Sequence, residues 1–183
     1  MKISVSFFIA ISLICMSQSC KKQSETSLKE EVETNNNSCP ADGNCKIDLL
    51  KGKKIIPKVD VTGQTYLKLE KGDKWVIKYT FTKNTPQNTV DGNYTEEIFI
   101  EIDPKKESIL LKNEDLSQAN VFFNKQCFCK SEAGYYKVEM GELYTLIEEN
   151  VFTIKFNFSI NETTHILHSF MEMIELDEKN TSK

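Results

Sequence analysis

The chain has 183 residues, a formal net charge of −4, and 23 basic residues, all of which are lysine. Without arginine it lacks the planar guanidinium group that grips phosphates and guanine bases through paired hydrogen bonds. This composition argues against nucleic-acid binding and against a phosphate site built from side chains. The length is sufficient for one domain with a sizeable core.

The N-terminus reads MKISVSFFIAISLICMSQSC, in which Lys2 is followed by an apolar stretch over residues 3–16. That stretch is shorter than the roughly 20 residues that a membrane-spanning helix needs, but it fits the hydrophobic region of a secretory signal. Small residues and then Cys20 follow it. A signal that ends in this way resembles the lipobox of bacterial lipoproteins, in the looser form found in small, uncharacterised bacteroidete-type lipoproteins.

The resemblance implies a signal peptide at residues 1–19, diacylglyceryl modification of the Cys20 thiol, cleavage before Cys20, and acylation of the new N-terminus. Ser17 stands three residues before the cysteine, where leucine is commonest in the family. Two or more acyl chains hold a protein stably on a membrane. The expected location is therefore the bacterial cell envelope, preferably the outer membrane, with the lipid anchor as the membrane contact. The alternative is an ordinary cleaved signal, in which Cys20 carries no lipid.

Residues 20–38 then contain only Leu28 and Val32 as sizeable apolar side chains. Such a segment cannot bury enough surface to offset the entropy of ordering it. It is predicted to be a flexible tether that begins at the lipidated cysteine. A single β-domain is expected at residues 39–178, followed by a disordered tail at 179–183.

The first half of this domain shows short alternating runs typical of strands. Residues 66–70 and 75–81 flank the sequence KGD, which predicts a hairpin with its turn at 71–73. Residues 96–103 and 108–112 are predicted to be strands that the turn DPKK connects. Helical spacing occurs only at 113–125, where Leu116, Ala119, Phe122 and Phe123 would share one side.

The second half has the clearest pattern, with strands predicted at 135–140, 142–148 and 151–160 and a final strand at 164–176. Along 151–160, large apolar residues alternate strictly with polar ones, so one face should be buried and one wet. The fold class predicted is all-β: an antiparallel sandwich or a meandering barrel with one short helix.

Four cysteines lie in the domain, Cys39 and Cys45 in SCPADGNCK and Cys127 and Cys129 in the sequence CFC. An even number of cysteines in an oxidising envelope indicates disulfides. Pairing Cys127 with Cys129 would close a tiny ring. Cross-pairing between the two groups closes loops of more than eighty residues, each worth roughly 4 kcal/mol. Cross-pairing is favoured, and both of its forms remain open.

A soft-metal site is the alternative use of the same four cysteines, with Zn²⁺ or Cu(I) as the ion. Their spacing is unusual for zinc, and neither pair has the C-x-x-C spacing of redox motifs. The two histidines, His165 and His168, are predicted to point to opposite faces of a strand. No cofactor is expected.

Catalytic signatures such as G-x-S-x-G and S-x-x-K do not occur in the sequence. Glu96 and Glu97 are adjacent on a predicted strand, so they should point apart as solvated charges. Aromatic residues could form a platform for a sugar or peptide, although core packing is the favoured interpretation. These residues are Trp75, Tyr79, Tyr135 and Tyr136.

The leading hypothesis is a non-enzymatic envelope lipoprotein, in which a disulfide-stapled β-domain binds or supports an unknown protein or glycan partner. The alternative is a copper- or zinc-binding protein.

Overall fold

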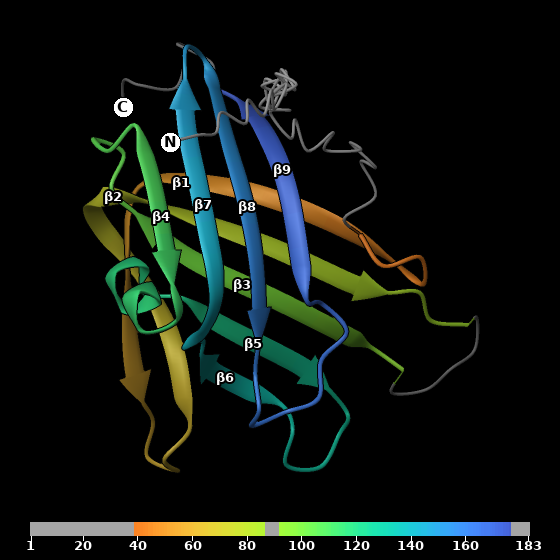
Figure 1. Ribbon diagram of the computed structural model, residues 1–183. Coiled ribbons are helices and arrows are strands. Elements are labelled where there is room, and N and C mark those ends of the chain that lie inside the picture. The colour runs from red at the N-terminus through yellow and green to blue at the C-terminus, as the bar shows by residue number, and fades with distance from the viewer. Residues whose placement is uncertain (1–38, 87–91, 177–183) are drawn as a thin grey trace, which may run out of the picture. The chain divides into compact units, whose positions relative to one another are not determined.

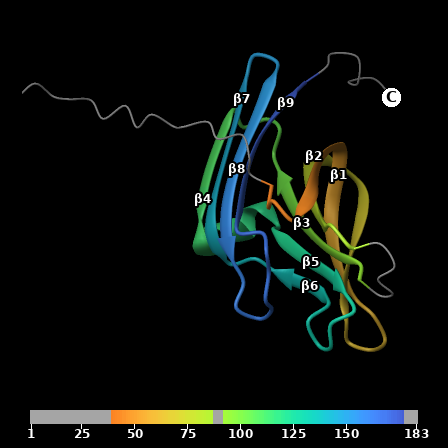
Figure 2. The same cartoon turned by 90° about the vertical axis from the view of Figure 1, so that its right-hand side faces the viewer.

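The computed structural model describes residues 39–86 and 92–176. The predicted signal peptide, tether and tail lie outside the described residues. Two antiparallel sheets face each other in the described chain, which is an all-β sandwich (Figures 1 and 2). The predicted fold class is therefore confirmed, and of the two arrangements the sandwich is the one formed. Within the described ranges no helix has the length and apolar character needed to cross a membrane.

The first sheet has the strand order β1-β2-β3-β5-β6, and the second has the order β4-β7-β8-β9. The chain passes from one sheet to the other after β3, after β4 and after β6, which ties the two layers together. The elements are β1 (Gly43–Val59), β2 (Thr65–Lys83), β3 (Tyr94–Ile102), β4 (Ser108–Lys112), the 3₁₀ helix η1 (Asn113–Ala119), β5 (Phe122–Cys127), β6 (Gly134–Lys137), β7 (Met140–Glu148), β8 (Val151–Ser159) and β9 (Ser169–Glu175).

The core lies between the two sheets and follows the alternation of the strands. The period-two prediction for residues 151–160 is confirmed, because the apolar members of that run are buried and most of the intervening residues are exposed. β2 and β3 contribute the facing residues of the first sheet, including Tyr79, Phe81 and Ile98. The buried members of the run are Phe152, Ile154, Phe156, Phe158 and Ile160.

The hairpin predicted within residues 66–81 is wrong. β2 continues through 71–73 without turning and pairs with β1 on both sides of Gly72 and Asp73, so the hairpin turn lies at residues 60–64. The pairing register shifts between Lys51 and Lys54, where Gly52 has φ = +67°. A left-handed conformation suits glycine, and such a bulge bends a strand. The KGD sequence therefore marks a bend in β2 opposite that bulge.

This bend lets the far half of the β1–β2 hairpin fold over the outer face of its own sheet. Ile55 donates its backbone N–H to a carboxyl oxygen of Glu101 on β3 at 2.6 Å. This hydrogen bond holds the far half of the hairpin against the sheet. A second apolar cluster forms beneath the hairpin, and it is separate from the core between the sheets. Its members are Leu50, Ile55, Leu67, Leu69, Val76, Phe99, Phe122 and Tyr135.

The helix predicted over 113–125 is only partly present. η1 covers Asn113–Ala119, and Asn120 ends it in a left-handed conformation with φ = 42°. The next residues form β5, in which Phe122 and Phe123 pair with β3. Aromatic residues favour strands when a partner strand is available, and here β3 supplies it. The last strand is also shorter than the predicted 164–176, because residues 160–168 form a connecting segment before β9.

Candidate functional site

The structure pairs the cysteines locally, as Cys39–Cys45 and Cys127–Cys129, with Cα–Cα distances of 5.6 and 5.2 Å. The favoured cross-pairing is therefore wrong. Neighbouring strands lie about 4.8 Å apart, so Cys45 on β1 and Cys127 on β5 are separated by about 14 Å across β2 and β3. A disulfide requires Cα atoms less than about 7 Å apart. Strand order, which the cysteine spacing does not reveal, excludes the cross-link.

The same separation prevents the four cysteines from holding one metal ion, so the alternative four-thiolate site is not formed. Among residues 39–86 and 92–176, no three or more Cys, His, Asp or Glu side chains are placed to share a metal. The sequence-based metal site is therefore corrected to two separate disulfides.

The two histidines do not point apart, contrary to the prediction. Their ring centroids are 4.5 Å apart, because residues 160–168 do not form a strand. His165 accepts the backbone N–H of Ile160 at Nε2, at 3.3 Å, and its Nδ1 lies 2.6 Å from the carbonyl oxygen of Leu167. An imidazole that accepts at Nε2 donates from Nδ1, so both ring nitrogens are used within the loop. His165 therefore acts as a structural support for this segment.

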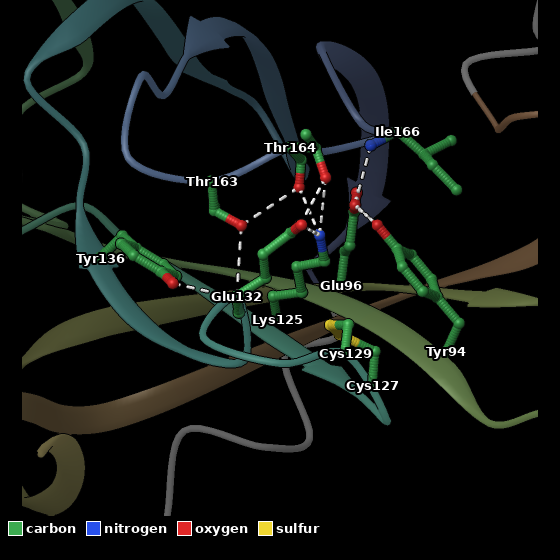
Figure 3. The surroundings of a disulfide bond; sticks show 10 residues. All are labelled: Tyr94, Glu96, Lys125, Cys127, Cys129, Glu132, Tyr136, Thr163, Thr164 and Ile166. Carbon is green, nitrogen blue, oxygen red and sulfur yellow. Dashed lines mark hydrogen bonds and ion pairs between the residues drawn. A yellow bond between two sulfur atoms is a disulfide. The ribbon is translucent and has the colours of Figure 1, made fainter. Parts of the chain in front are cut away.

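A buried polar cluster lies beside the Cys127–Cys129 disulfide, at the end of the sandwich where β5 meets residues 160–168 (Figure 3). Alternation along β5 puts Lys125 on the inner face, where its side chain is buried. Its ammonium group donates to Glu132 at 2.5 Å, to the Thr164 carbonyl oxygen at 2.7 Å and to Oγ1 of Thr164 at 2.9 Å. These three acceptors use all three ammonium hydrogens.

Glu132 belongs to the loop between β5 and β6 and is the half-exposed partner of Lys125. The hydrogen bond from Lys125, with a further one from the Thr164 hydroxyl, holds the pKa of Glu132 below its ordinary value. The backbone carbonyl of Glu132 accepts the hydroxyls of Tyr136 at 2.9 Å and Thr163 at 3.2 Å. The loop that follows the disulfide is thereby fastened to β6 and to residues 160–168.

Glu96 on β3 is fully buried, which contradicts the prediction of a solvated charge. Its two carboxyl oxygens accept the backbone N–H groups of Ile166 and Leu167, both at 2.7 Å, and the hydroxyl of Tyr94. Burial, together with the hydrogen bond to Glu96, raises the pKa of Tyr94 above its ordinary value. Glu96 thus joins the connecting segment of the second sheet to the middle of the first.

Glu97 lies on the opposite face of β3, so the prediction that the two carboxyl groups point apart is correct. It is also buried rather than solvated, because the side chains around it cover it. It contacts the ammonium group of Lys78 at 2.6 Å and accepts the side-chain amides of Asn124 at 2.7 Å and Gln126 at 3.1 Å.

Phe128 stands between the two paired cysteines and is 86% exposed. Beside it lies an open hollow of about 290 Å³, which Asn93, Thr95, Gln126, Cys127 and Phe128 line. Its side chains offer hydroxyl and amide groups next to an aromatic ring, and none is charged. This chemistry suits a neutral polar ligand, such as a sugar or an extended peptide.

No known protein family model matches this chain. Curated proteins and solved structures also give no match. Inference about function therefore rests on the sequence features and on the geometry of this end of the sandwich.

The favoured interpretation of core packing is confirmed for the tyrosine on β2, and the alternative aromatic platform is not formed. Tyr79 is fully buried and stacks on Phe170 at 4.1 Å. Trp75 packs edge-on against Phe152 at 6.1 Å. The two tyrosines of β6 face opposite clusters, with Tyr136 against the main core and Tyr135 against the outer one.

Sequence reasoning missed the buried charges, above all Lys125 and Glu96. The sequence did contain a signal for a strand, because Phe123, Lys125 and Cys127 occupy every second position and would share one face of a strand. The helical interpretation of residues 113–125 hid it. Nothing in the sequence marked Thr163 and Thr164, whose roles depend on the contact between the two sheets.

Proposed function

We propose that the chain is a non-enzymatic lipoprotein of the bacterial envelope, anchored through lipid on Cys20, whose β-sandwich binds a protein or glycan partner at the disulfide end. The observation that carries the binding proposal is Phe128, a large aromatic side chain held 86% exposed between two paired cysteines. Buried aromatic anchors dominate binding energies at interfaces, so an exposed one on a constrained loop is a suitable contact.

The surroundings of Phe128 favour binding because they are fixed in advance. The loop is closed by the disulfide at one end and held by Lys125 through Glu132 at the other. A preorganised loop loses little entropy when a partner docks. The adjoining hollow supplies Thr95 and Gln126 as hydrogen-bonding groups beside the aromatic ring.

The non-enzymatic part of the proposal is supported by how the polar groups of this region are used. The Lys125 ammonium group donates three hydrogen bonds within the fold, and both ring nitrogens of His165 have partners. A general base or nucleophile needs a free lone pair directed toward a substrate. Both groups instead hold loops in place.

The anchor is tested by replacing Cys20 with alanine and fractionating the cells. The native chain should be found in the membrane fraction and take up radiolabelled fatty acid. Cys20→Ala should move to the soluble fraction and take up none. Retention of the variant in the membrane fraction would refute the lipoprotein assignment.

The binding surface is tested by photo-crosslinking in living cells. A photoreactive phenylalanine analogue at position 128 should give one dominant cross-linked adduct. The mass of this adduct above that of the chain alone should show whether the partner is a protein or a glycan-bearing molecule. The same analogue at Met173, which is 61% exposed on the second sheet, is the matched control. Equal adduct patterns from the two positions would contradict a specific site at Phe128.

A further inference from the structure

The β1–β2 hairpin carries a surplus of positive charge that the rest of the chain lacks. Between Gly43 and Lys83 there are ten lysines and four acidic residues, whereas the whole chain has a formal net charge of −4. Lys74, Lys78 and Lys83 pair with carboxylates outside this range, so the surplus lies mainly in the far half of the hairpin, where residues 52–71 hold five lysines and two acidic residues. A surplus of one sign on a protein of the opposite sign directs that face toward partners of complementary charge. For this hairpin the complementary partner is anionic.

The far half of the hairpin presents its lysines outward. The pairing register places Lys54 opposite Glu70 and Lys58 opposite Tyr66, on the face away from Ile55, which packs against the first sheet. Within residues 39–86 and 92–176, neither Lys54 nor Lys58 has a carboxylate within salt-bridge distance. Their charges are therefore available to an external partner.

The tip of the hairpin carries two exposed valines on either side of the exposed Asp60, and its turn is held in one shape. Val61 is fully exposed, and Val59 is 68% exposed beside it. The carboxylate of Asp60 accepts the backbone N–H groups of Thr62 at 2.8 Å and Gln64 at 2.9 Å, which fixes the turn. In Figures 1 and 2 this turn lies at the lower end of the molecule.

We propose that this tip inserts into the surface of an anionic lipid membrane. Val59 and Val61 enter the boundary between headgroups and acyl chains, Tyr66 lies at the headgroup level, and Lys54 and Lys58 contact lipid phosphates. Apolar side chains with lysines behind them are the two components of interfacial membrane binding. A soluble acidic partner would account for the lysines but would give the exposed valines no apolar surface to bury.

This inference rests on the proposed function, because a lipid on Cys20 keeps the domain near a membrane. Residues 21–38 can reach at most roughly 60 Å when fully extended, so the domain stays within that distance of the bilayer. At such a distance even a weak contact of the tip is populated, because tethering raises its effective concentration. The tip then sets which face of the domain meets the membrane.

The test uses the mature chain, residues 20–183, with Cys20→Ser, so that no lipid contributes to binding. Its partition is measured by sedimentation with vesicles of pure phosphatidylcholine and with vesicles that contain phosphatidylglycerol. The chain should bind the anionic vesicles at least about tenfold more tightly. Each lysine near an anionic surface contributes about fivefold, so Lys54→Gln with Lys58→Gln should reduce binding roughly 25-fold.

Val61→Asp should reduce binding to anionic vesicles at least about tenfold, because it puts a carboxylate where an apolar side chain would be buried. The matched controls are Met173→Asp, exposed on the other sheet, and the pair Lys130→Gln with Lys155→Gln. These controls should change binding less than about twofold, and circular dichroism checks that every variant is folded.

Equal binding to both kinds of vesicle, no loss with Val61→Asp, or the same loss with Met173→Asp would each overturn the proposal. Binding to soluble dextran sulfate without binding to vesicles also overturns it and identifies the hairpin as a site for an acidic polymer. Because the chain tested carries no lipid, these results are independent of whether Cys20 is acylated in cells.

Discussion

Glu96 and Glu97 are neighbours on β3 and both are buried, but they bind different partners on the two faces of the strand. Glu96 faces the space between the sheets and binds backbone N–H groups of residues 160–168. Glu97 faces outward and binds the side chains of Lys78, Asn124 and Gln126, all in its own sheet. One carboxyl group joins the two layers, and the other supports a single layer.

The comparison shows why burial alone does not measure the importance of a polar group. The backbone N–H group of Leu167, which Glu96 accepts, has no route to water if Glu96 is removed, because Leu167 is buried. Two of the three side chains that contact Glu97 can turn toward solvent, since Lys78 is only half-buried and Gln126 is exposed, whereas Asn124 is buried. Unsatisfied buried donors are costly, whereas rehydrated ones cost little.

The largest expected effect therefore comes from Glu96→Ala, which should lower the free energy of unfolding by about 3 kcal/mol. Glu97→Ala should lower it by about 1 kcal/mol, because two of its three partners, Lys78 and Gln126, regain water. Urea unfolding followed by tryptophan fluorescence gives both values. Equal losses of unfolding free energy in the two variants would show that the backbone contacts of Glu96 stabilise the fold no more than the side-chain contacts of Glu97.

A second comparison uses the lysines on the same two faces. Lys125→Met should lower the free energy of unfolding by about 2 kcal/mol, because Thr164 and the loop at Glu132 lose their shared donor. Lys78→Met on the outer face should cost about 0.5 kcal/mol. Proteolysis of residues 127–133 provides a second readout, and it should accelerate only in Lys125→Met. Faster proteolysis of residues 127–133 in Lys78→Met would contradict the expected difference between the two faces.

The smallest expected effect is a dependence on pH that comes from Glu132. Its pKa is held below the ordinary value of 4.5, so the folded state binds its proton less tightly than the unfolded chain does. The stabilising contribution is complete above pH 4.5 and is lost as the pH falls through the lower, folded-state pKa. Unfolding between pH 3 and 7 should show a stability loss on acidification that is smaller in Glu132→Gln. An unchanged profile in that variant would assign the loss to other groups.

The sequence alone was sufficient to predict strands in which one face is apolar and the other polar. Residues 151–160 could be predicted because Phe152, Ile154 and Phe156 alternate with polar residues and a single core covers them. The path of the β1–β2 hairpin could not be predicted, because its far half buries residues such as Ile55 against the outer face of its own sheet. That packing depends on a bend at Gly52 that has no periodic signature.

The candidate site was less predictable than the fold. All four cysteines of the domain were identified, but their pairing depends on the strand order that separates β1 from β5. Glu96 could not be recognised as buried, because its partners at 166 and 167 lie 70 and 71 residues away. Polar contacts between distant backbone segments leave no local pattern.

The proposed binding end depends on the Cys127–Cys129 disulfide, which encloses Phe128. Disulfide mapping of the purified protein tests this pairing most directly. Cleavage after lysine without reductant yields residues 30–46, with Cys39 and Cys45, and residues 126–130, with Cys127 and Cys129. Each peptide should appear by mass spectrometry as a separate species that lacks two hydrogens. A species that links residues 30–46 to residues 126–130 would contradict the local pairing and the presentation of Phe128 that depends on it.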